Sequence, residues 1–193
     1  IVKVVPDQVT LIIQVEQSGT DAKDVQKSTD RIIADVLKYL RKSDIDERDV
    51  RTQHIRLNKN YDYQTKTYSY VANQSLVVLI RDLSEYPSLM NDLLDTGINR
   101  IDGITFDSSR RETLENEARV KAMKDAKDKA MLYASTLGQK IGKAIHISEF
   151  QAMPSPGPMY RSAMVMEDAP SGPTMSPGEM EIRVKINVNF ELL

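Results

Sequence analysis

The order of strand-like and helix-like patterns in the first 107 residues most constrains the fold of this chain. Aliphatic and β-branched runs typical of strands lie at residues 9–15, 49–58, 68–81 and 101–106. A helical pattern follows the first run, and a shorter one follows the third. The order strand, helix, strand, strand, helix, strand is the split βαβ arrangement of ferredoxin-like folds. We therefore predict an α+β fold with a βαββαβ antiparallel sheet and two helices.

Local signals place the ends of these elements. The residues Ser18-Gly19-Thr20-Asp21 are expected to supply a turn and the N-cap of the first helix, and the helix is expected to end near Ser43. Ser84 is expected to cap the second helix, with Pro87 in its first turn and an end at Gly97. The continuous apolar run 76–80 predicts a central, buried strand.

The remainder of the chain predicts a long helix and two further strands. The helix spans about 109–137 and the strands about 144–150 and 181–190. Residues 151–174, rich in proline and methionine, are expected to form a mobile loop. The chain is thus either one domain over 1–193 or two packed subdomains, about 1–107 and 108–193.

Composition excludes several classes of protein. The 26 basic and 28 acidic residues give a net charge of −2 and form no basic run, which disfavours nucleic acid binding. No cysteine is present, so neither disulfides nor thiolate metal sites are expected. No stretch is apolar enough for a transmembrane segment. Because the sequence starts at Ile1, we expect that an N-terminal piece is missing, and a cleaved signal peptide is one candidate.

No residue pattern indicates catalysis. The two histidines, His54 and His146, lie on different expected strands without neighbouring ligands. Nucleophile-elbow and phosphate-loop sequences are absent. We expect a protein that is not an enzyme and that uses neither a cofactor nor a metal.

The long helix carries alanines at strict four-residue spacing. Each step of four advances about 40° beyond a full turn, so the row winds around the helix. It can therefore serve packing within the chain, an oligomer contact, or both. The row consists of Ala118, Ala122, Ala126, Ala130 and Ala134.

Two further segments are candidate interaction surfaces. Tyrosines, including Tyr61 and Tyr63, gather near the tip of the expected hairpin and suit a ligand, a subunit contact or simple cross-strand pairing. Methionines of the expected loop could bind Cu(I), undergo oxidation, coat a partner groove, or have no chemistry. They include Met153, Met159, Met164 and Met166.

The chain resembles the SIMPL-domain family. The resemblance covers nearly all of it and rests on several short matches in order rather than on one diagnostic motif. Ser69 and Ile98 depart from that pattern, where a glycine and a small residue are common. The matches are Pro6-Asp7, Thr52, Leu57, Tyr61, Tyr70-Val71-Ala72, residues 97–106, Glu117-Ala118-Arg119, Ala122, Asp125-Ala126, Lys129-Ala130, Gly138, Ile141-Gly142, Glu149 and Pro177-Gly178.

The resemblance implies an exported, often periplasmic bacterial protein. Some members are associated with oxidative-stress defence and others with ring-like or channel-like assemblies, and no catalytic residues are carried over. The leading hypothesis is a homo-oligomer that protects or scaffolds through its surfaces. The alternatives are metal or oxidant handling by the methionines, binding of another protein, and an enzyme with an unrecognised pocket.

Overall fold

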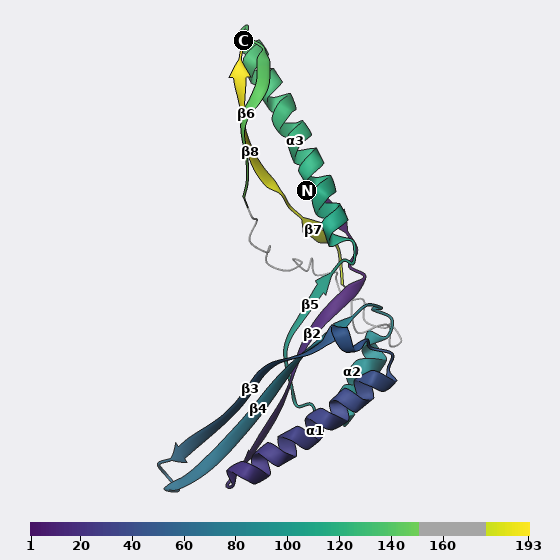
Figure 1. Cartoon of the computed structure of the whole chain (residues 1–193), viewed down its shortest axis with the longest axis vertical. Helices are drawn as coiled ribbons and strands as arrows, with labels where there is room; N and C mark the ends of the chain where they lie inside the picture. Colours follow the sequence, from purple (N-terminus) through teal and green to yellow (C-terminus); the bar gives the residue numbers. More distant parts are fainter. Residues whose placement is uncertain (151–176) are drawn as a thin grey trace, which may run out of the picture. The chain divides into compact units, whose positions relative to one another are not determined.

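The chain divides into two compact units (Figure 1). The computed structural model describes residues 1–150 and 177–193, so the expected loop at 151–174 lies outside the described residues. We call residues 7–107 the sheet unit. The described residues 1–6, 108–150 and 177–193 form the helix–hairpin unit.

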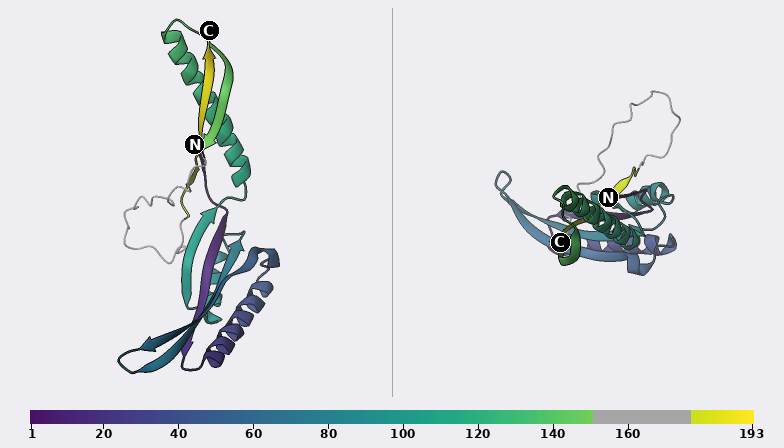
Figure 2. Two further views of the ribbon diagram at one scale, coloured as in Figure 1. Left: turned by 60° about the vertical axis from the view of Figure 1, so that its left-hand side comes forward. Right: turned by 90° about the horizontal axis from the view of Figure 1, so that it is seen from above.

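The sheet unit has the predicted βαββαβ order. Its four strands pair antiparallel in the order β3-β4-β2-β5, and both helices cover one face of the sheet (Figure 2). This confirms the predicted α+β class. The elements are β2 (Gln8–Gly19), α1 (Ala22–Lys42), the 3₁₀ helix η1 (Glu47–Asp49), β3 (Val50–Asp62), β4 (Thr67–Ile80), α2 (Tyr86–Asp95) and β5 (Arg100–Asp107).

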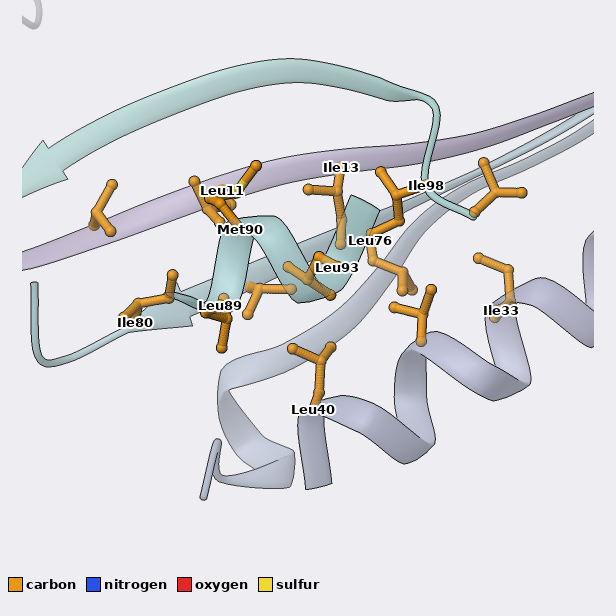
Figure 3. Packing of buried hydrophobic residues seen from close by; sticks show 14 residues of the cluster. Leu11, Ile13, Ile33, Leu40, Leu76, Ile80, Leu89, Met90, Leu93 and Ile98 are labelled. Atoms are coloured by element: carbon orange, nitrogen blue, oxygen red, sulfur yellow. The ribbon is translucent and has the colours of Figure 1, made fainter. Parts of the chain in front are cut away.

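The core of the sheet unit lies between the two central strands and the helices (Figure 3). Ile13 of β2 and Leu76 of β4 are cross-strand partners, and both are buried. Leu40 of α1 and Leu93 of α2 close the core from the helix side. β4 lies between β3 and β2, as its apolar run predicted.

The predicted start of α1 is confirmed, whereas that of α2 is wrong. Asp21 accepts hydrogen bonds from the backbone N–H groups of Lys23 and Asp24, at 2.8 and 3.1 Å. α2 begins after Glu85 without a side-chain cap. Ser84 is held in the preceding turn, where its N–H donates to Asp82 Oδ1 at 2.8 Å. Ser84 therefore belongs to the turn before α2, and its side chain does not cap the helix.

We expect the Asp21→Ala variant to lose about 1 kcal/mol of stability, because two helix N–H groups would lose their acceptor. Urea unfolding followed by circular dichroism measures the loss. Asp21→Asn is the matched variant, since an amide oxygen still accepts at this position and should retain most of the stability. Equal losses in both variants would show that the cap is not what Asp21 contributes.

The helix–hairpin unit contains one long helix and two pairs of strands. α3 (Arg111–Thr136) runs along the antiparallel pair β6 (Ile141–Phe150) and β8 (Lys185–Leu192). β1 (Val2–Val4) pairs with β7 (Met180–Ile182). A small core joins α3 to the β1–β7 pair through Val2, Leu114, Ala118 and Ile182.

The strands differ most from the sequence expectation in three places. The predicted strand 181–190 is interrupted, because β7 pairs with β1 whereas β8 pairs with β6. β1 has only three residues, too few to show a period, and was not predicted. Ser18 and Gly19 belong to β2 instead of a turn. Gly19 is required by a close approach, since a Cβ there would lie 2.9 Å from Cγ2 of Val25.

Candidate interaction surfaces

The alanine row of α3 is buried at both ends and half-buried between them. Ala118 and Ala134 are 0% and 2% exposed. Ala122, Ala126 and Ala130 keep intermediate exposure. At its first position the row packs inside the unit, against the β1–β7 pair. An oligomer contact through the three middle alanines stays a prediction.

The helix–hairpin unit exposes many large apolar side chains. Val120 and Leu132 on α3 lie twelve residues apart and so point about 120° away from each other. Apolar groups therefore occupy more than one side of the unit. The ten side chains on α3, the turn after it and the β6–β8 pair that are at least two-fifths exposed are Val120, Met131, Leu132, Tyr133, Leu137, Ile145, Ile147, Phe150, Leu192 and Leu193.

An ion pair joins α3 to β6. Arg119 donates from Nε to Oε2 and from Nη2 to Oε1 of Glu149, both at 3.0 Å. This contact lowers the pKa of Glu149 and raises that of Arg119. Both side chains are well exposed, so the pair adds little to the stability of the unit.

In the sheet unit, β3 is exposed along almost its whole length. It forms the edge of the sheet and pairs only with β4, and every residue from Arg51 to Asp62 is exposed. Ile55 and Leu57 are 62% and 45% exposed. They lie two residues apart and therefore on one face of the strand. Ile55 and Leu57 thus form an uncovered apolar stripe on β3. Within the described residues no strand lies on the outer side of β3.

An open groove of about 420 Å³ lies next to this stripe. Leu57 lines it from β3, and the first half of α1 lines it from the other side. The residues that α1 contributes are Ala22, Lys23, Gln26, Lys27 and Asp30.

The predicted tyrosine cluster forms at the hairpin tip. The ring centroids of Tyr61 and Tyr63 are 5.0 Å apart, edge to face, and those of Tyr61 and Tyr68 are 4.8 Å apart. Lys59 Nζ lies 3.8 Å from the centroid of Tyr68. At the turn, hydrogen bonds from Gln64 and Thr65 lower the pKa of Asp62. The rings contact one another and Lys59 but stay exposed, Tyr63 to 84%, so a role of the cluster in binding stays a prediction.

The described residues contain no group of three or more histidine or acidic side chains that could hold a metal ion. His54 and His146 are exposed, one in each unit. The four methionines considered for metal or oxidant chemistry all lie between 151 and 176, outside the described part of the chain. No helix in the described ranges is long and apolar enough to cross a membrane.

Comparison with known proteins identifies the family. Residues 1–190 match the model of the SIMPL family, described as a protein of unknown function (DUF541). The chain belongs to the SIMPL family. The resemblance carried by residues 97–106 and by the alanine-bearing helix is thereby confirmed.

Named relatives cover most of this SIMPL chain. The 26 kDa periplasmic immunogenic protein of Brucella melitensis is 25% identical over 97% of the chain and 79% of its own length. The uncharacterized protein YggE of Escherichia coli K12 is 29% identical over 87% of the chain and 69% of its own length. The YggE protein of Edwardsiella ictaluri is 26% identical over 99% of the chain.

Two surface features were missed at the sequence level. Apolar residues on α3 do not form a single stripe, and this pattern alone could have indicated that the helix meets more than one neighbour. The exposure of β3 had no such signal. Its alternation is typical of a half-buried strand, and only the observed path of α1 leaves Ile55 and Leu57 uncovered.

Proposed function

We propose that this SIMPL protein is exported and self-assembles through its helix–hairpin unit, acting through surfaces rather than catalysis. The observation that carries the proposal is the set of ten exposed apolar side chains on α3, the turn after it and the β6–β8 pair. Export is supported by the Brucella relative, whose name describes it as periplasmic.

The size of this apolar surface fits a protein–protein interface, and the proposed partner is a second copy of the chain. An aromatic side chain offers roughly 150–250 Å² and an aliphatic one somewhat less, so at their exposed fractions the ten together hold on the order of 1,000 Å². Divided between two sides of the unit, this gives about 500 Å² on each, which is close to the apolar part of the ~800 Å² that each partner contributes to a standard interface. Because the groups point in different directions, each copy would meet two neighbours, and such contacts can close into a ring.

We expect the wild-type chain to show a discrete mass that is a multiple of 21.8 kDa by size-exclusion chromatography with light scattering. The double variant Tyr133→Lys, Leu137→Lys should shift to a smaller assembly or to the monomer. Its two positions are 65% and 72% exposed and lie one helical turn apart. The new charges would therefore lie within any interface formed on that side of α3.

The matched control is Ile55→Lys, Tyr63→Lys in the sheet unit. These positions are 62% and 84% exposed, and the added charge is the same, but the assembly should keep its mass. A wild-type monomer at high protein concentration would contradict the proposal. Equal effects of both double variants would also contradict it, because assembly would then not depend on the helix–hairpin unit.

A protective role in oxidative stress is the expected cellular consequence. A strain lacking the gene should survive peroxide less well, and wild type should restore survival. The Tyr133→Lys, Leu137→Lys variant should not restore it, whereas the control variant should. Full rescue by the assembly-deficient variant would separate protection from assembly and refute this role for the assembled form.

A further inference from the structure

The β3 edge carries a positive charge that no contact in the described residues neutralises. Arg51, Arg56 and Lys59 are all exposed on this strand, and Asp62 is its only acidic residue. Lys23 and Lys27 add charge from the far wall of the groove, which Asp30 offsets in part. Asp62 is turned to the hairpin tip, where it accepts hydrogen bonds from Gln64 and Thr65.

From this edge we propose a second function: β3 binds an extended segment of another protein, in which acidic and apolar residues alternate, by adding it to the sheet as a fifth strand. Main-chain hydrogen bonds supply the contact in this mode of recognition, and alternate side chains supply its specificity. The proposal is independent of self-assembly, since it uses the sheet unit and not the helix–hairpin unit.

The two faces of β3 define the sequence of the partner strand. Leu57 pairs with the buried Ala72 and lines the groove, so the side chain opposite Leu57 in an added strand points into that groove. Arg56 lies on the other face, as successive residues of a strand alternate. An apolar side chain therefore suits the position opposite Leu57, and a carboxylate suits the position opposite Arg56.

The charge also argues against a second copy of β3 as the occupant. The midpoint of the thirteen residues Val50–Asp62 is Arg56. Full antiparallel overlap of two copies would place the two Arg56 side chains directly opposite each other, and like charges at such positions are destabilising. A shift of register places Arg56 opposite Lys59, which repels as well. Natural edge strands use such charges to prevent self-pairing.

The opposite edge of the sheet lacks these properties. β5 has eight residues and includes Asp102, whose carboxylate is bound by Arg100 at 2.7 Å. Both edge strands have one irregularity in their pairing, β5 beside Ile12 and Ile13 of β2 and β3 between Thr52 and His54. The two edges therefore differ in length and charge, and a short edge strand is the weaker template. β5 thus serves as an internal control for β3.

The test uses the full chain and a fluorescent nine-residue peptide of alternating glutamate and valine with blocked ends. We expect saturable binding by fluorescence anisotropy that weakens as salt rises. The variant Arg56→Glu, Lys59→Glu should bind roughly tenfold more weakly. The pair of Arg56 with a glutamate becomes repulsive, and Lys59, which lies on the face of Leu57, becomes a second negative charge beside the acidic peptide. The variant Arg31→Glu, Lys38→Glu makes the same charge change at exposed positions of α1 and should bind as wild type does.

Hydrogen exchange distinguishes strand addition from simple attraction between charges. The peptide should slow exchange at alternate amides of β3 and leave those of β5 unchanged. A peptide with lysine in place of glutamate should not bind. The proposal is overturned if the glutamate peptide does not bind, if the lysine peptide binds equally well, or if binding leaves the β3 amides unprotected. It is also overturned if a single-stranded oligonucleotide displaces the peptide and produces the same pattern of protection.

Discussion

The Leu93→Ala variant is expected to lose about 2–5 kcal/mol of unfolding free energy, the usual range for truncating a buried leucine. Leu93 is fully buried at the centre of the core, where α2 faces the two central strands (Figure 3). Truncation removes its apolar contacts and leaves a cavity that the surrounding sheet cannot close. Since domains of this size are stable by about 5–15 kcal/mol, the loss should be large enough to measure by urea unfolding.

Leu94 provides the matched control for Leu93. It follows directly in α2 and is 50% exposed, so Leu94→Ala should change stability by no more than about 0.5 kcal/mol. The two substitutions alter the same helix with the same change of residue. Equal losses would contradict the packing described for α2, because alanine is at least as good a helix former as leucine and helix propensity could not explain a loss at Leu94.

The fold of the sheet unit could be predicted because its signals are local. The apolar steps of α1 and the run at 76–80 each fit one type of element, and their order leaves few topologies. Ser84 shows the limit of this reasoning. A serine before an apolar helix is a good cap in isolation, but Asp82 binds the Ser84 backbone N–H, and the helix begins two residues later.

The helix–hairpin unit was harder to predict because its pairing is not local. β1 lies at the start of the chain, and its partner β7 lies near the end. The break between β7 and β8 follows from this pairing, and no pattern within residues 181–190 indicates it. Long-range partners therefore account for both errors in this part of the chain.

The surface properties of β3 and the hairpin tip could not be predicted from the sequence alone and required the structure. Tyr61 and Tyr63 could be placed at a hairpin tip from sequence, yet the position of Lys59 over the neighbouring Tyr68 could not. The sequence shows Arg56 and Lys59 as ordinary charges in a mixed chain of net charge −2. Among the described residues β3 pairs with β4 alone, and this pairing places them along an open edge.

The two roles offered for the alanine row can be separated by enlarging one alanine at a time. Ala118→Leu should cost about 1–3 kcal/mol, the usual cost of adding bulk to a packed core. Ala118 is fully buried against Val2, Leu114 and Ile182, and no space remains for a larger side chain. Hydrogen exchange in α3, read with urea unfolding, measures the loss in this unit.

Ala130→Leu is the informative partner of that variant. Ala130 lies twelve residues further along α3, so it points about 120° away from Ala118 and is only half-buried. If the middle of the row contacts another subunit, Ala130→Leu should leave the stability of α3 nearly unchanged and should lower the assembled mass in light scattering. If Ala130→Leu instead loses as much stability as Ala118→Leu and the mass stays unchanged, the whole row serves packing within the chain. Assembly would then depend on the exposed apolar side chains alone.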